Sequence, residues 1–212
     1  MALQRIVVVR LSTPNPTQLM SRGTILILAG PEYEDLELWY PKLRLEEAGY
    51  EAPIAGIGEK EYRGKHGYPA KVDGHVREFV ADTLTGIVVP GGWAPDKLRR
   101  DKDVLQRVRE VNEAAKMVAT ICHGPWVLIS AGIVKGRRMT STVGIRDDVV
   151  NAGAEWVDEP VVVDGNLISA RVPRDLPAFG QAMLERLGMQ QTGEFDARKT
   201  PARGVHFGSL IK

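Results

Sequence analysis

The chain has 212 residues, 43% of them hydrophobic, which is enough for one α/β domain with a substantial buried core. Its 28 basic and 27 acidic side chains nearly cancel, which argues against a general nucleic-acid or polyanion surface. The apolar runs have the length of strands rather than of a bilayer span, no signal peptide is evident, and a single cysteine requires no oxidising compartment. We therefore expect a soluble, cytoplasmic protein.

The two ends of the chain differ in composition from the middle. Residues 1–23 are predicted to be an N-terminal extension, because a Pro/Ser/Thr/Asn-rich loop follows Leu11 and translation could begin well at Met20. The alternative is an ordinary edge strand at Ile6–Val9. Residues 189–212 are polar and interrupted by Gly and Pro, and are predicted to be a surface appendage. The domain itself is expected to span residues 24–188.

Strands and helices alternate from residue 24 onward, and Pro41 is expected to kink the first helix. The predicted strands are 24–29, 50–57, 86–90 and 116–121; the helices are 34–48, 101–115, 124–131 and 173–187; hairpins are expected at 64–74 and 161–169. This order predicts a three-layer α/β sandwich with a mostly parallel central sheet and helices on both faces. Ligands of such sheets bind at the carboxyl ends of the strands.

The lone cysteine lies at such an end, in the sequence A-T-I-C-H-G-P-W of residues 119–126. A strand that runs into a helix across one residue forces Cys122 into a strained conformation and points its side chain into the cleft. The free N–H groups of the next helix then favour a thiolate, so we expect a lowered pKa for Cys122. The alternative is an inert cysteine in the core.

The residues around this turn also fit a site. Gly124 is predicted to let a substrate approach the backbone, and Gly91 and Gly92 end another buried strand at the same edge of the sheet. Trp93 and Trp126 follow the two turns, either as pocket walls or as ordinary, partly buried aromatic residues. The alternative for the two glycines is a plain turn after a strand.

A metal site and a cofactor site are not expected. His66, His75 and His206 show no ligand spacing relative to one another. The sequence has no phosphate-binding loop, and Gly56-Ile57-Gly58 lacks the rest of a dinucleotide fingerprint.

Several motifs together closely resemble the PfpI family of intracellular cysteine peptidases, within the ThiJ/PfpI superfamily. They include A-T-I-C-H-G-P at 119–125, E-Y-E-D-L-E-L at 32–38, V-V-P-G-G-W-A-P-D at 88–96 and N-A-G-A-E-W-V-D at 151–158. The resemblance covers about residues 24–188. It implies a flavodoxin-like fold of the class I glutamine amidotransferase type.

The resemblance also implies roles for particular residues. Cys122 matches the nucleophile and His123 the adjacent base, while Glu34 matches an acid whose carboxyl lies near the sulfur. Asp96 stands where peptidase members carry a glutamate that reaches the histidine of a neighbouring subunit. The N–H groups of Gly92 and His123 would line the oxyanion pocket. From the residues alone, Glu34 could instead be a helix N-terminal acid and Asp96 a helix cap.

Further expectations from the resemblance concern assembly and activity. A homo-oligomer is implied, either a dimer or a hexamer of three dimers, in which Asp96 completes the site across subunits. The first functional hypothesis is a cofactor-free cysteine hydrolase, either a peptidase or a glyoxalase or deglycase that acts on methylglyoxal and its adducts. A deep pocket walled by tryptophans would favour small aldehydes, and an open trench between subunits would favour peptides. The alternative is a redox-responsive stress protein in which Cys122 is oxidised.

Overall fold

The computed structural model describes residues 21–188, and the predicted edge strand at Ile6–Val9 and the C-terminal appendage lie outside them. A seven-stranded sheet in the order β10-β11-β7-β6-β1-β2-β5 forms the centre of the described part. Its strands are β1 (Thr24–Leu28), β2 (Ile54–Gly56), β5 (Gly74–His75), β6 (Leu84–Val89), β7 (Met117–Ile121), β10 (Val161–Asp164) and β11 (Leu167–Ala170). All neighbouring strands pair in parallel except β10 and β11, which pair antiparallel.

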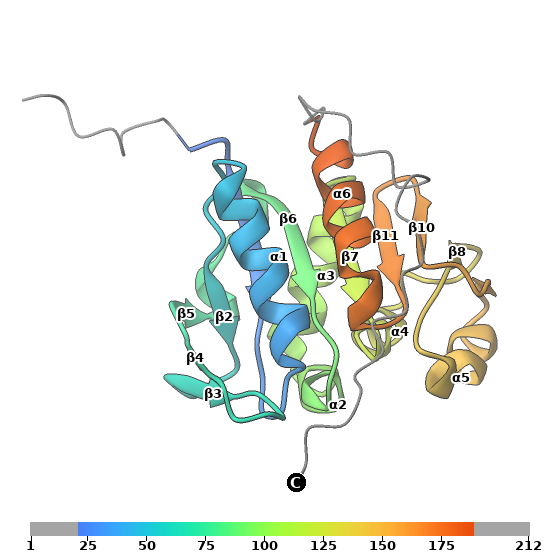
Figure 1. Ribbon diagram of the computed structural model, residues 1–212, viewed down its shortest axis with the longest axis horizontal. Coiled ribbons are helices and arrows are strands. Elements are labelled where there is room, and N and C mark those ends of the chain that lie inside the picture. Colours follow the sequence, from blue (N-terminus) through green and yellow to red (C-terminus); the bar gives the residue numbers. More distant parts are fainter. Residues whose placement is uncertain (1–20, 189–212) are drawn as a thin grey trace, which may run out of the picture.

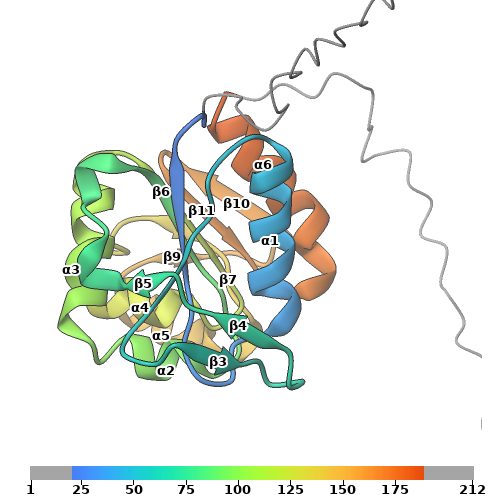
Figure 2. The ribbon, with the colours of Figure 1, turned by 90° about the vertical axis from the view of Figure 1, so that its left-hand side faces the viewer.

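Helices cover both faces of the sheet, as predicted (Figure 1). The helices are α1 (Asp35–Glu47), α2 (Ala94–Leu98), α3 (Lys102–Glu113), α4 (Pro125–Ala131), α5 (Arg146–Asn151) and α6 (Leu176–Arg186). Figure 2 shows α1 and α6 together on one face and α3 and α4 on the other. The described residues contain no helix that is both long and apolar enough to cross a membrane, and the expected cytoplasmic location stays a prediction.

The buried strands have the composition expected for a sheet covered on both faces. Four of the five residues of β1 and all five of β7 are buried, and both strands are apolar runs. On α3, Val104, Val108 and Val111 form the buried stripe, and Asp101 caps the helix by accepting hydrogen bonds from the N–H groups of Asp103 and Val104.

Several predicted boundaries were wrong. The second strand is β2 alone, much shorter than the predicted 50–57, and the hairpin begins earlier, with β3 (Glu61–Arg63) and β4 (Pro69–Lys71) joined by the turn at 64–68. Helix α1 continues through Pro41. The last helix is preceded by a 3-10 turn, Pro173–Asp175.

Some elements were not predicted at all. These are the helix α5, the paired strands β8 (Arg138–Met139) and β9 (Glu155–Trp156), and the 3-10 turns Val76–Glu78, Ala81–Thr83 and Val143–Ile145. Each is short, so hydrophobic periodicity has too few residues to detect it.

The close approach of β6 to β7 leads to a prediction about stability. A Cβ at Gly86 would lie 2.9 Å from both the Cβ and the carbonyl oxygen of Met117. We expect Gly86→Ala to lower the free energy of unfolding by about 1–3 kcal/mol, because the strands must separate to admit the methyl group. Gly144→Ala is the matched control, since a Cβ there meets nothing within 4 Å. Chemical denaturation that found equal effects for the two variants would contradict this packing.

Candidate active site

Cys122 occupies a strained turn between β7 and α4, as predicted. Its φ is 60°, in the left-handed region that residues with a side chain rarely adopt. Hydrogen bonds fix the turn on both sides: Cys122 N–H donates to the Ala170 carbonyl (3.1 Å), and the Cys122 carbonyl accepts from Thr142 N–H (3.2 Å). Since Cys122 is the single cysteine of the chain, any thiol chemistry belongs to this position.

Packing requires a glycine at position 124, and the predicted approach of a substrate to its backbone stays a prediction. A Cβ at this position would lie 2.3 Å from the Thr120 hydroxyl oxygen and 2.4 Å from the Val89 carbonyl oxygen. The start of α4 is therefore pressed against β6 and β7, where a side chain has no room. Pro125 occupies the first turn of the helix, as expected.

The Gly91–Gly92 loop brings a second segment to the cysteine and is more than a plain turn. Gly92 has φ 73° and bridges to Tyr33, while Trp93 N–H donates to the Glu32 carbonyl at 2.9 Å. A Cβ on Gly91 would lie 2.7 Å from the Cβ of Cys122 and 2.5 Å from Oε2 of Glu37, so only a glycine fits between these two residues.

The acidic group that acts on Cys122 belongs to Glu37, which the sequence analysis missed. Glu37 lies in the first turn of α1 and is fully buried, and its Oε2 accepts a hydrogen bond of 2.8 Å from Gly91 N–H. Its Oε1 makes no hydrogen bond within the described residues. The detectable signal was an acid beside Leu38 on the face of α1 that also buries Pro41 and Leu45.

Glu34, which was predicted to lie near the sulfur, has its carboxylate paired with a lysine. Its backbone precedes α1 as the N-cap residue, and its carboxylate forms an ion pair with Lys65 at 2.9 Å. The alternative interpretation, an acid at a helix N-terminus, describes its position correctly, although the side chain makes no capping hydrogen bond.

Burial and the Glu37 carboxylate shape the protonation of the sulfur. Desolvation first, and then the charge of Glu37, raise the pKa of Cys122 to about 12, although the backbone N–H groups of Gly92 and His123 act in the opposite direction. The predicted lowering of the thiol pKa was therefore wrong: the helix N–H groups help, but burial outweighs them. Desolvation also raises the pKa of Glu37 to about 8, so this carboxyl is mostly protonated at neutral pH.

His123 is placed to take the thiol proton. Its Nδ1 lies 3.1 Å from Cys122 Sγ. Burial first, and then the charge of Lys65, lower the pKa of His123, so its ring is neutral and can accept a proton at neutral pH. No ion pair joins His123 to a carboxylate in the part of the chain that the structure describes.

Asp96 does not orient His123 within this chain. Arg100 holds its carboxylate through two hydrogen bonds of 2.8 Å, and Lys97 lies 3.6 Å away. The hydrogen bonds from Arg100 lower the pKa of Asp96 first, and the nearby charges lower it further. Asp96 lies in the first turn of α2 and does not cap it. Its predicted role in a neighbouring subunit stays a prediction.

The two tryptophans flank the histidine. Ring centroids lie 5.3 Å apart for Trp93 and His123, and 5.0 Å apart for His123 and Trp126. Both tryptophans also line a cavity of about 330 Å³, together with Pro31, Glu32, Asp96 and Lys97. They are therefore pocket walls, one of the two possibilities that the sequence left open.

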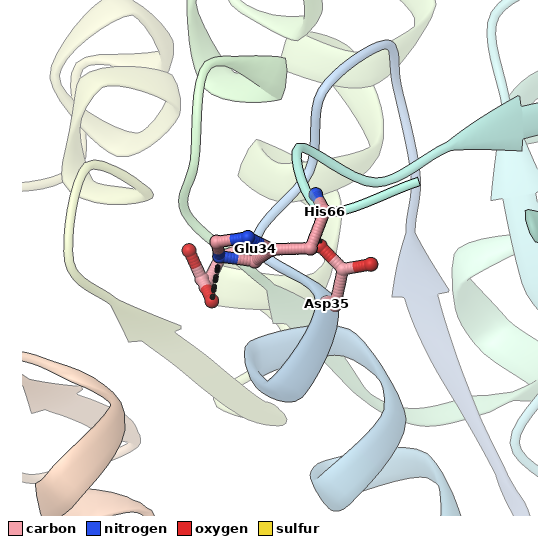
Figure 3. A group of neighbouring side chains, drawn as sticks. All are labelled: Glu34, Asp35 and His66. Atoms are coloured by element: carbon pink, nitrogen blue, oxygen red, sulfur yellow. Dashed lines mark hydrogen bonds and ion pairs between the residues drawn. The ribbon is translucent and has the colours of Figure 1, made fainter. Parts of the chain in front are cut away.

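A second group of ionisable side chains lies beside the site, at the start of α1. Glu34, Asp35 and His66 come close enough to share a cation (Figure 3). However, both carboxylate oxygens of Asp35 accept hydrogen bonds of 3.0 Å, from the N–H groups of His66 and Tyr68, and Lys65 neutralises Glu34. This donor set is already satisfied by protein groups, and we assign it to holding the 64–68 turn rather than to a metal.

The described residues form an α/β sandwich with a cysteine on a strained strand-to-helix turn, a neutral histidine beside it and a buried carboxyl nearby, an arrangement that can carry out thiol chemistry. The chain belongs to the DJ-1/PfpI family, whose sequence model matches residues 23–186. This confirms the resemblance on which the sequence analysis relied.

Individual relatives agree with this assignment. A protein of Pyrococcus furiosus named deglycase PfpI is 48% identical over 163 residues, which cover 77% of this chain and 98% of the relative. The Bacillus subtilis protein named putative cysteine protease YraA is 38% identical over 164 residues, 77% of this chain and 97% of its own. A two-domain Anabaena variabilis protein with DJ-1/ThiJ/PfpI-like and ferritin-like domains superposes with a TM-score of 0.77 at 41% identity, over 78% of this chain and 48% of that one.

The buried carboxyl of Glu37 leads to a prediction about stability and pH. Because its pKa is raised from 4.5 to about 8, the folded protein loses stability as the pH rises through this range. Glu37→Gln cannot ionise, so we expect it to be more stable than wild type by on the order of 2 kcal/mol at pH 9, with the difference shrinking towards pH 5.

Denaturant titrations at several pH values would measure this difference. Glu47→Gln, an exposed change at the other end of α1, is the control and should shift stability by less than about 0.5 kcal/mol. A Glu37→Gln variant that is less stable than wild type at pH 9 would contradict this prediction, because it would show that the ionised carboxylate stabilises the folded protein.

Proposed function

We propose that this protein is a cofactor-free, cysteine-dependent hydrolase that acts on small carbonyl compounds, as a deglycase or glyoxalase for methylglyoxal and its adducts. The observation that carries the proposal is the neutral His123 Nδ1 at 3.1 Å from Cys122 Sγ. The two tryptophans that flank His123 also line a neighbouring cavity. Two relatives that are 48% and 47% identical over 163 matched residues are named deglycases, which supports the same reaction class.

The first step is attack on the carbonyl carbon. As the new S–C bond forms, the thiol proton passes to His123 Nδ1, and the carbonyl π electrons move onto oxygen. The backbone N–H groups of Gly92 and His123 already interact with the sulfur, and they supply hydrogen-bond donors for the negative charge that develops on the carbonyl oxygen. Base-assisted attack suits a thiol whose pKa is raised, because a resting thiolate is not required.

Glu37 has a distinct role in this scheme. While it holds its proton it adds no negative charge beside the sulfur, and its otherwise unpartnered Oε1 can donate to the adduct. Once it ionises, the carboxylate opposes a negative sulfur or oxygen. Protonated Glu37 therefore favours reaction, and ionised Glu37 disfavours it.

The size of the cavity favours small substrates over polypeptides. A volume of about 330 Å³ lies at the lower end of the range for small-molecule pockets. The name of the Bacillus subtilis relative keeps peptides as the second substrate class to be tested.

Oxidation of Cys122 as the main role ranks lower. Peroxide reacts with thiolates, and burial together with Glu37 raises the pKa of this thiol, which reduces the thiolate fraction at neutral pH.

We also propose that the active form is a homo-oligomer, a dimer or a hexamer, in which Asp96 of one copy completes the site of the next. Two observations support this: His123 lacks a carboxylate among residues 21–188, and Asp96 lies on the cavity rim with its side chain partly exposed. Light scattering that finds a monomer with full activity would contradict it.

Turnover of methylglyoxal tests the proposed reaction. We expect Cys122→Ser and His123→Phe to lower kcat/KM by at least about 100-fold, because one removes the nucleophile and the other its base. A peptide substrate, and peroxide titration of Cys122 by mass spectrometry, are the parallel measurements. Peptide cleavage without methylglyoxal turnover, or stoichiometric oxidation without turnover of either substrate, would contradict the proposal.

The pH profile of kcat/KM tests the role of Glu37. Activity should fall above pH 8 as Glu37 ionises, and it should fall on the acidic side below the lowered pKa of His123. Glu37→Gln should remove the alkaline limb and keep the acidic one. If the alkaline limb is unchanged in this variant, the fall in activity comes from the ionisation of another group, and the proposed role of Glu37 is wrong.

A further inference from the structure

Lys65 is a cation at the catalytic centre that the reaction scheme above does not use. It lies in the 64–68 turn between β3 and β4, and its backbone N–H donates to the Tyr33 carbonyl at 2.9 Å. Tyr33 in turn bridges to Gly92, whose neighbour Gly91 packs against Cys122. A short chain of backbone contacts therefore ties Lys65 to the rim of the nucleophile.

The 64–68 turn is fixed independently of Lys65. Asp35 accepts hydrogen bonds of 3.0 Å from the N–H groups of His66 and Tyr68, on either side of Gly67. Gly64 packs so closely on Asp35 that a Cβ would lie 2.4 Å from its carboxylate. Lys65 is thus presented by a rigid turn, and its side chain can be changed without removing these contacts.

The ion pair that holds Lys65 is asymmetric. The Glu34 side chain is 8% exposed, whereas the Lys65 side chain is 42% exposed, and their charged atoms lie 2.9 Å apart. The carboxylate is therefore the buried end and the ammonium the open end of the pair. An ammonium has three N–H donors, and Glu34 is its one side-chain partner among the described residues, so donors remain for a ligand.

The charge of Lys65 reaches the groups of the site. Burial raises the pKa of Glu37 and lowers that of His123, and the Lys65 charge lowers both. Lys65 also interacts electrostatically with the Cys122 sulfur. An anionic group on a substrate bound at Cys122 would feel the same field.

We propose that Lys65, anchored by Glu34, is a specificity-determining residue that binds a carboxylate or similar anionic group on the carbonyl substrate attacked by Cys122. The substrate class, but not the anion subsite itself, rests on the proposed function. The subsite selects α-oxo acids and carboxylate-bearing adducts over neutral aldehydes of equal size.

Alkylation of Cys122 tests the subsite without any enzymatic activity. Iodoacetate and iodoacetamide both form an S–CH₂ bond with the thiolate and release iodide, and they differ in charge. Because both react with the same thiolate, the ratio of their rates cancels the ionisation of the thiol. The protein unfolded in denaturant supplies the intrinsic ratio, since Cys122 is the single cysteine.

We expect native wild type to favour iodoacetate, and Lys65→Met to lower the iodoacetate-to-iodoacetamide ratio about three- to tenfold, with a smaller effect near 1 M salt. Lys65→Arg should keep most of the preference. Lys97→Met is the matched control, because Lys97 lines the cavity between Trp93 and Trp126 and neighbours the Asp96 carboxylate. A ratio unchanged in Lys65→Met, a larger fall in Lys97→Met, or a native Cys122 that neither reagent reaches would overturn the proposal.

Steady-state kinetics then tests the substrate class. Lys65→Met should raise KM for glyoxylate, an anionic α-oxo aldehyde, about three- to tenfold more than KM for neutral methylglyoxal, because effects that act through the pKa values of Glu37 and His123 are common to both substrates. Equal changes for the two substrates would overturn the assignment. If wild type turns over neither compound but keeps its alkylation preference, the proposed function fails while the subsite stands.

Discussion

The site depends on one interaction, the close approach of a buried carboxyl and a partly buried cysteine across a glycine. Glu37 and Cys122 approach each other on either side of Gly91, where any side chain would collide with both. Burial penalises ionisation of both groups, and the Glu37 charge raises the pKa of Cys122 further, whereas the Cys122 side chain acts to lower the pKa of Glu37. At neutral pH Glu37 is therefore mostly protonated, unlike an isolated glutamate, and Cys122 is a thiol. In the proposed reaction Cys122 therefore needs a base to take its proton, and the neutral His123 lies within reach, with Nδ1 3.1 Å from the sulfur.

The fold explains how such a pair can exist in a stable protein. Cys122 is held in its strained conformation by backbone hydrogen bonds to Ala170 and Thr142, and Glu37 is carried by a helix that packs on the sheet through Leu38 and Leu45. The cost of the strained turn and of the buried acid is offset by the core beneath them. In the proposed functions, the cavity between Trp93 and Trp126 and the partly exposed ammonium of Lys65 discriminate among substrates.

Much of this architecture could be predicted from the sequence, because long apolar strands and periodic helices carry strong signals. The strand–cysteine–helix junction at Cys122 was recognisable, since Pro125 and Gly132 bound a short helix directly after a buried strand. The pKa of the Cys122 thiol, in contrast, was not predictable from the sequence. The helix N–H groups suggested a lowered thiol pKa, whereas the depth of burial, which the sequence does not state, raises it.

The choice between Glu34 and Glu37 failed for a related reason. Both acids lie in the same helical turn, and the motif drew attention to the first, but the rotation of α1 points the second at the sulfur. Lys65 was missed because a lysine in a turn has no pattern of its own. Its position is set by the hydrogen bonds from His66 and Tyr68 to Asp35, which join segments about thirty residues apart.

The most direct measurement is the pH dependence of iodoacetamide alkylation of Cys122 in wild type and in Glu37→Gln. If the carboxylate governs the sulfur, the thiol of the variant titrates at a lower pH than that of wild type. Superimposable titration curves would contradict the account.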